Sequence, residues 1–306
     1  MKYVMTIILA IVVLIIPGCS TTDTGTIDTG TLALKLIDAP VDSENIAGVY
    51  IAISKIEVNK STGDNANWET VKEFDEMLEY NLLDLTDGNF ALLGEFELTA
   101  GQYNQIRFIL DIQEHGQQSP TTPGCYVQFT DGSSESLFVP SGGQTGYKAV
   151  GAFEVPANGE VQVTVDFDLR KALQVTGQGN NQRYILKPTL RLVVDSQTGN
   201  INGTITLETT YTDIIVFAYE DNEWNISEAD EPVVGESRFA NAVTSSKLND
   251  DGAYVLAYLA YGTYDLVIVG YNGDTYGEVM GIVSDVALDS NQMVLPINAD
   301  NLEVIE

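Results

Sequence analysis

The chain has 306 residues and a formal net charge of −30, from 44 acidic and 14 basic residues. Apolar residues make up 44% of it, enough for a buried core, so the chain is not a disordered acidic tail. The charge excludes a nucleic-acid-binding protein, because phosphates would be repelled, and predicts a well-solvated acidic surface. The length fits one large or two ordinary domains.

The N-terminus has the features of a secretory signal. An uncharged run follows Lys2, and it is too short for a transmembrane helix, which needs about 20 apolar residues. The run ends at Ile16-Pro17-Gly18-Cys19, which resembles the lipobox of bacterial lipoproteins, where the cysteine receives a diacylglyceryl group and becomes the new N-terminus. An ordinary signal peptide with an incidental cysteine is the alternative.

We therefore predict a signal peptide over residues 1–18 and a lipidated cysteine with a flexible tether over residues 19–30. The lipid on Cys19 is the expected membrane partner, since two or more acyl chains anchor a protein stably. Ser20 resembles the residue that directs Gram-negative lipoproteins to the outer membrane. The side of the membrane that the protein faces stays open.

From Thr31 onward, apolar and polar residues alternate with period two, which predicts half-buried strands. The expected strands are Leu32–Leu36, Val49–Ile53, Gln105–Asp111, Tyr126–Thr130, Glu135–Val139, Val161–Phe167 and Tyr184–Val194. Turn signals such as Asp87-Gly88 and Asn158-Gly159 separate them. Helices are expected only over Glu73–Tyr80 and Leu169–Leu173.

A polar, turn-rich stretch over residues 195–200 precedes a second series of strands. These are expected over Ile201–Leu207, Asp213–Tyr219, Ala253–Ala257, Tyr264–Tyr271 and Val283–Leu288. The composition also changes, because residues 196–306 hold 19 acidic and two basic residues. We predict an all-β protein with two tandem antiparallel β-sandwich domains, over residues 31–195 and 196–306.

One short pattern occurs in both predicted domains. Leu98-Thr-Ala-Gly101-Gln-Tyr103 matches Leu259-Ala-Tyr-Gly262-Thr-Tyr264, so in each a glycine turn is followed by a tyrosine that enters a new strand. In β-sandwiches such a corner tyrosine ties its hydroxyl to nearby backbone. We predict a structural role for both tyrosines.

Several motifs in order resemble the bacterial lipoprotein family known as domain of unknown function 4382. They are Leu34-x-Leu36-x-Asp38-Ala39-Pro40, Ile53-x-x-Ile56-Glu57-Val58, Asn81-Leu-Leu-Asp84-Leu85, Gly101-x-Tyr103-x-Gln105-Ile106-Arg107, Val165-Asp-Phe-Asp168 and Leu186-Lys187-Pro188. The segment from Gly199 to Leu288 contains Gly203-Thr-Ile, Asn249-Asp250-Asp251-Gly252-x-Tyr254 and Leu259-x-x-Gly262-x-Tyr264. By these motifs it is similar to transthyretin-like or carboxypeptidase regulatory-like sandwiches. These resemblances imply non-catalytic modules, some relatives of the second kind binding carbohydrate, and fold analogy alone does not assign function.

The sequence offers few candidates for catalysis. His115, the only histidine, precedes Cys125 in a turn-rich loop, but a nucleophilic pair needs a geometry that nothing here fixes, and a small buried cysteine is the simpler interpretation. Asp166 and Asp168 could share a cation, but nearby Arg170, Lys171 and Lys187 favour structural salt bridges. Asp38 is expected to cap a turn.

Two segments remain as candidate binding features. Asn249-Asp250-Asp251-Gly252 resembles part of a calcium loop but lacks the downstream glutamate, so a hairpin turn is the simpler interpretation. Trp224 lies in an acidic, amide-containing loop and could stack on a sugar. We predict no cofactor, no resident metal and no catalytic residue.

These features favour a non-catalytic cell-envelope lipoprotein that binds or presents a glycan or a protein partner. A structural spacer within a surface assembly is the first alternative. A metal-assisted hydrolase built on carboxylates is the second, for which the sequence offers no nucleophile motif or ligand spacing.

Overall fold

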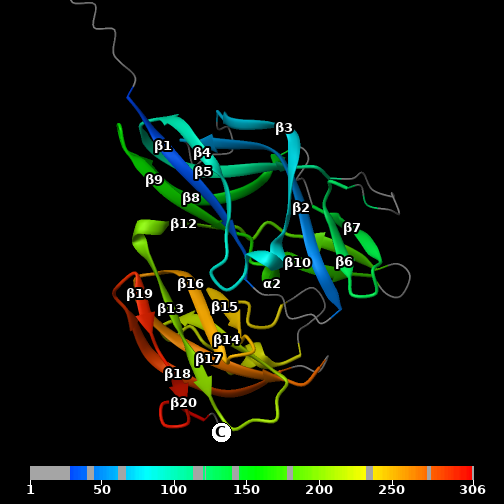
Figure 1. The fold of residues 1–306 in the computed structure, drawn as a ribbon, viewed down its shortest axis with the longest axis vertical. Coiled ribbons are helices and arrows are strands. Elements are labelled where there is room, and N and C mark those ends of the chain that lie inside the picture. The colour runs from blue at the N-terminus through cyan, green and yellow to red at the C-terminus, as the bar shows by residue number, and fades with distance from the viewer. Residues whose placement is uncertain are drawn as a thin grey trace, which may run out of the picture.

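The computed structural model describes residues 28–39, 45–60, 67–112, 120, 122–139, 145–177, 182–231, 237–273 and 277–304. Cys19, the predicted signal peptide and His115 lie outside these residues. The fold is all β, and the strands form two groups stacked along the long axis of the molecule (Figure 1). Strand β1 begins at the end of the molecule that is opposite the C-terminus.

The first group is a twelve-stranded, strongly curled sheet in the order β10-β11-β7-β6-β2-β5-β8-β12-β9-β1-β4, with β3 on β2. Its strands are β1 (Thr29–Ile37), β2 (Ile46–Asn59), β3 (Glu69–Asn81), β4 (Ala91–Thr99), β5 (Gly101–Leu110), β6 (Tyr126–Phe129), β7 (Ser134–Phe138), β8 (Tyr147–Val155), β9 (Glu160–Asp166), β10 (Leu173–Thr176), β11 (Arg183–Leu186) and β12 (Arg191–Val194). Two short helical turns, η1 (Leu82–Leu85) and α2 (Leu169–Ala172), join strands of this group.

The second group is a sandwich of two four-stranded sheets that follows η3 (Asp195–Gln197). One sheet has the order β16-β13-β19, with β20 on β13, and the other has the order β15-β14-β17-β18. The elements are β13 (Thr198–Thr206), β14 (Asp213–Glu220), η4 (Ile226–Ala229), β15 (Thr244–Lys247), β16 (Ala253–Ala260), β17 (Gly262–Tyr271), β18 (Glu278–Leu288), β19 (Gln292–Val294) and β20 (Ile297–Asn298).

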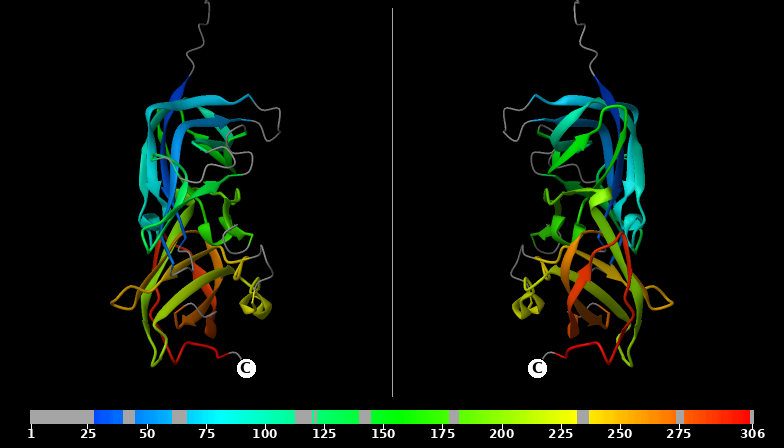
Figure 2. Two further views of the ribbon diagram at one scale, coloured as in Figure 1. Left: turned by 90° about the vertical axis from the view of Figure 1, so that its right-hand side faces the viewer. Right: turned by 90° about the vertical axis from the view of Figure 1, so that its left-hand side faces the viewer.

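Most neighbouring strands are antiparallel, but some long-range pairs are parallel. Strand β9 runs parallel to β1, β12 parallel to β8, and β13 parallel to β19 and β20. Alternation along a strand does not reveal the direction of its neighbour, because both arrangements place side chains on alternate faces. Figure 2 shows the layered arrangement of both groups from the side.

Each group has its own core. In the first, the inward residues of the curled sheet form one cluster around Phe108, Tyr147 and Phe167. In the second, the two sheets bury a cluster between them, and the outer face of β14 and β17 is covered by the segment that carries Phe239. Because both faces of β14 and β17 are buried, these strands read as continuous apolar runs.

The helix predicted over Glu73–Tyr80 is wrong. This segment is the middle of β3, which pairs antiparallel with β2 and packs Phe74 against the first core. Its acidic residues and leucine suit a helix, but cross-strand pairing with an apolar neighbour outweighs local propensity. The strand predicted over Tyr184–Val194 is also two strands, β11 and β12, because Pro188 lies between them and has no amide hydrogen to donate.

The remaining predicted strands and the short helix at Leu169 are confirmed. The tyrosines of the repeated motif are confirmed as corner residues. The Tyr103 hydroxyl donates to the Thr99 carbonyl at 2.8 Å, and the Tyr264 hydroxyl donates to the Ala260 carbonyl at 2.7 Å. In both cases the bond spans four residues across the turn, so the sequence repeat is a repeat of structure.

Candidate functional site

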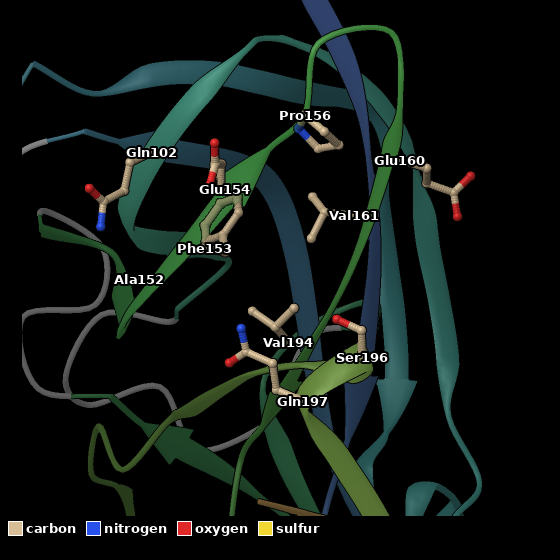
Figure 3. Close-up of a pocket in the computed structure, with 10 residues that line it drawn as sticks. All are labelled: Gln102, Ala152, Phe153, Glu154, Pro156, Glu160, Val161, Val194, Ser196 and Gln197. Carbon is tan, nitrogen blue, oxygen red and sulfur yellow. The ribbon is translucent and has the colours of Figure 1, made fainter. Parts of the chain in front are cut away.

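The first candidate site is a cleft between β8 and β9, the strands joined by the turn at residues 156–159 (Figure 3). Farther from this turn, β12 lies between the two strands. Arg191–Val194 pair with β9 from Asp166 to Val163, and Arg191 also pairs with Val150 of β8. After Val194 the chain leaves the sheet as η3. Between Val194 and the turn at residues 156–159, no described strand therefore lies between β8 and β9.

The cleft has an apolar floor and a polar rim, with a volume of about 590 Å³. Phe153, Val161 and Val194 form the floor, and Phe153 is buried although it borders the cleft. The rim side chains are Gln102, Glu154, Glu160, Ser196 and Gln197 (Figure 3). Since both rim carboxylates lack a cationic partner among the described ion pairs, the rim is acidic.

A groove of about 630 Å³ adjoins the cleft and shares Glu160, Val161 and Ser196 with it. It extends from β9 across η3 to the turn between β16 and β17, where Tyr261 is 45% exposed. We call it the Tyr261 groove. Its other lining residues are Gln162, Asp195, Thr198 and Asn291.

One side of the Tyr261 groove is fixed by Lys35 of β1. The Lys35 ammonium donates to Asp195 Oδ2 at 2.8 Å and to Gln162 Oε1 at 3.2 Å, and it lies 4.7 Å from the centre of the half-exposed Phe90 ring. The Thr164 hydroxyl donates to the other Asp195 oxygen at 2.6 Å. The polar groups beside Tyr261 are therefore held in defined orientations.

The predicted carboxylate pair is buried between the two strand groups, and both members are salt-bridged. Asp166 binds Arg191 at 2.8 Å, and Asp168 binds Arg170 at 2.8 Å and Lys171 at 3.0 Å. The partner of Asp166 is Arg191 rather than Lys187. Burial raises the pKa of Asp166 against the opposing effect of the Arg191 charge.

The same cations join the two strand groups. Arg191 donates to the Tyr258 carbonyl at 2.8 Å, and both Arg170 and Lys171 donate to the Ala242 carbonyl, at 3.2 and 2.7 Å. The Asp166 and Asp168 cluster is thus an ionic junction, because each carboxylate holds a cation that reaches the second group. Its geometry favours the structural interpretation of these aspartates.

Asp38 lies in the same buried region. Its Oδ1 accepts from the Leu169 amide at 2.9 Å, at the start of the short helix α2, so it caps an amide 131 residues away rather than one in its own turn. Its Oδ2 is buried and has no hydrogen-bond partner among the residues that the structure describes. Burial, with the nearby charges of Asp166 and Asp168, raises the pKa of Asp38 well above the usual range of an aspartate.

The other residues singled out in the sequence have structural surroundings. Asn249 closes a hairpin turn, because its side-chain oxygen accepts from the amides of Asp251 and Ala253 at 3.0 and 2.9 Å. Trp224 is half-buried, with its ring 6.0 Å from Phe239 and 5.1 Å from Tyr219 between ring centres. Part of its surface is thus committed to the second core, and a ligand role for Trp224 stays a prediction.

Cys125 is buried at the start of β6, and burial raises the pKa of its thiol to about 12. The Cys125–His115 pair is not tested, because His115 lies outside the described residues. Within the described ranges, no group of three or more His, Cys, Asp and Glu side chains is placed to hold a metal ion. None of the helices described is long and apolar enough to cross a membrane.

Sequence reasoning missed Tyr261 and the cleft. Tyr261 stands inside the Leu259-Ala-Tyr-Gly262 repeat, and the corresponding residue of the first copy is Ala100, so an aromatic residue in a turn was the available signal. The cleft has no sequence signal, because it depends on where β12 inserts between two strands distant from it in the chain.

Residues 29–188 match the family described as Domain of unknown function (DUF4382). The chain belongs to this family. The matched region ends before β12, so the strand that borders the cleft lies beyond it. No curated protein matches the chain.

Among solved structures, the chain is 13% identical to the Bacillus anthracis TIE protein, with a TM-score of 0.18 over 89% of this chain and 34% of that one, so it spans about a third of that structure. It is 11% identical to a minor pilin of Streptococcus agalactiae, with a TM-score of 0.19 over 90% and 96% of the two chains. A Pseudomonas aeruginosa protein named as a candidate carbohydrate binding protein is 17% identical, with a TM-score of 0.20 over 33% and 88%. Similarities this weak carry no argument about function.

Proposed function

We propose that this protein is a non-catalytic, lipid-anchored module of the cell envelope that binds a glycan in the Tyr261 groove. The observation that carries the proposal is an exposed tyrosine ring beside fixed amide and carboxylate groups. An aromatic face covers the apolar face of a sugar, and amide and carboxylate oxygens accept from its hydroxyls. We propose Cys19 as the anchor and the outer membrane as the location.

The acidity of the groove narrows the glycan class. Glu160 is exposed on the groove, and the chain as a whole carries a net charge of −30. A polyanionic polysaccharide would be repelled. The proposed ligand is therefore a neutral or amino-substituted glycan.

The contacts between the two strand groups support a rigid body, which suits presentation of a site away from a membrane. Besides the ionic junction, the Ser246 hydroxyl donates to Asp87 Oδ1 at 2.7 Å across the same boundary. We propose that the groups are the two domains predicted for residues 31–195 and 196–306, held at a fixed angle. The same rigidity would serve the spacer alternative.

Glycan arrays with the full chain carrying Cys19→Ser test the binding site. We expect binding to a neutral or amino-substituted glycan, weakened at least about tenfold by Tyr261→Ala, which corresponds to about 1.4 kcal/mol. Tyr261→Phe is the matched control, because it keeps the ring and should keep most of the affinity. Trp224→Ala tests whether the loop that carries Trp224, the candidate from the sequence, contributes to glycan binding.

No signal across neutral and amino-substituted glycans would leave the spacer as the better function. A signal that Tyr261→Ala leaves unchanged would place the site elsewhere. The anchor has its own test: the unsubstituted chain should enter the detergent phase of a Triton X-114 extraction, and Cys19→Ser should move it to the aqueous phase. Detergent-phase retention of Cys19→Ser would overturn lipidation at this residue.

A further inference from the structure

The cleft between β8 and β9 exposes two strand edges that face each other. On β9, Glu160, Val161 and Gln162 pair with β1 on one side. On β8, Phe153 and Glu154 pair with β5 on one side. Among the described residues, no strand pairs with the other side of either segment.

The missing strand has a structural cause. Strand β12 enters the space between β8 and β9 from the end opposite the 156–159 turn, antiparallel to β9 and parallel to β8. Its continuation would pass beside Gln162 and Val161, but Asp195 turns out of the sheet into η3. Lys35 and Thr164 hold both Asp195 oxygens, at 2.8 and 2.6 Å. These bonds hold the chain after Val194 outside the sheet, so the gap between Val194 and the 156–159 turn stays open.

An open strand edge is a template for β-addition, because its amide and carbonyl groups can pair with an incoming extended segment. In this gap an incoming segment would have a strand edge on each side, just as β12 pairs with both β8 and β9 farther from the turn. The floor offers apolar contact through Phe153, Val161 and Val194. The gap closes at the 156–159 turn, so only a short segment fits.

The rim indicates the chemistry of that segment. Glu154 of β8 and Glu160 of β9 both line the cleft, and both are exposed and outside the ion pairs described. A lysine or arginine next to an apolar residue would face these carboxylates while the apolar side chain met the floor. We propose that the cleft accepts a short, extended, basic segment of a partner polypeptide, which adds a strand between β8 and β9.

This proposal is independent of glycan binding, although the cleft and the Tyr261 groove share Glu160, Val161 and Ser196. Tyr261 lines only the groove, so Tyr261→Ala should leave peptide binding unchanged. The two proposals can therefore fail separately.

The test uses the full chain carrying Cys19→Ser and a capped, fluorescent Lys-Val-Lys-Val-Lys peptide as the probe, followed by fluorescence anisotropy. We expect saturable binding, with a Glu-Val-Glu-Val-Glu peptide binding at least about tenfold more weakly. Glu154→Lys/Glu160→Lys should reverse this preference. The matched control is Glu95→Lys/Glu97→Lys, which makes the same charge change on exposed residues of β4 and should keep the original preference.

A second probe separates strand pairing from simple charge attraction. A lysine-valine peptide with N-methylated valines keeps its charge but loses backbone donors, and it should bind at least about tenfold more weakly. Hydrogen exchange at the amides of Glu160 and Gln162, which point away from β1, should also slow when the unmodified peptide is bound. Equal binding of the N-methylated peptide, or an equal effect of the β4 control, would overturn strand addition in the cleft.

Discussion

Removing the hydroxyl of a corner tyrosine should destabilise the protein without changing its packing. Tyr103 and Tyr264 are buried, and each donates one hydrogen bond to a carbonyl four residues earlier. Phenylalanine keeps the ring, so the stack of Tyr103 on Phe153, at 5.4 Å between ring centres, would remain. The substitution therefore isolates the bond that ties the turn.

The expected loss follows from the bond alone. A net intramolecular hydrogen bond contributes about 0.5–1.5 kcal/mol to stability. We expect Tyr103→Phe and Tyr264→Phe each to lower the free energy of unfolding by about 1 kcal/mol. Since the residues lie in different strand groups, their effects should add in the double variant.

Calorimetry and urea denaturation measure the effect. A loss of about 1 kcal/mol lowers the unfolding midpoint by about 2–4 °C in a domain of 150–250 residues. Tyr261→Phe is the control, because Tyr261 is 45% exposed in the turn and should change the free energy by less than about 0.5 kcal/mol. If the buried variants matched this control, the repeated motif would have no stabilising role.

Three further predictions concern buried groups. Arg191→Leu leaves the buried Asp166 carboxylate without its cation and should cost about 3–5 kcal/mol in urea denaturation; a loss below about 1 kcal/mol would show that the pair is not needed. The pKa of Asp38 is raised by burial, so the folded protein binds more protons than the unfolded chain and the stabilising contribution of protonated Asp38 is lost as pH rises through that pKa. Asp38→Asn should therefore be more stable than the parent at pH 7 and no more stable at pH 3, where Asp38 is protonated in both states; an unchanged difference between the two pH values would contradict this. Cys125, with a thiol pKa of about 12, should resist iodoacetamide at pH 8 in the folded Cys19→Ser chain and react in urea, and rapid labelling of the folded chain would show that its site opens.

The sequence by itself determined the class of fold, because period-two alternation and turn residues mark strands whatever their partners are. It also predicted the two corner tyrosines, since their bonds to Thr99 and Ala260 are local in the chain. The hairpin at Asn249 followed from residue chemistry in the same way, whereas the amide that Asp38 binds lies 131 residues away in the chain.

The tertiary structure decided the features that depend on distant partners. The segment around Phe74 is a strand because β2 pairs with it, although its composition suits a helix. Arg191 neutralises Asp166 because β12 inserts beside β9, and that insertion also opens the cleft. The exposed Tyr261 lines one groove with Gln162 and Asn291 only because β9, η3 and two turns converge. Local patterns carry no information about such contacts, since each joins residues far apart in the chain.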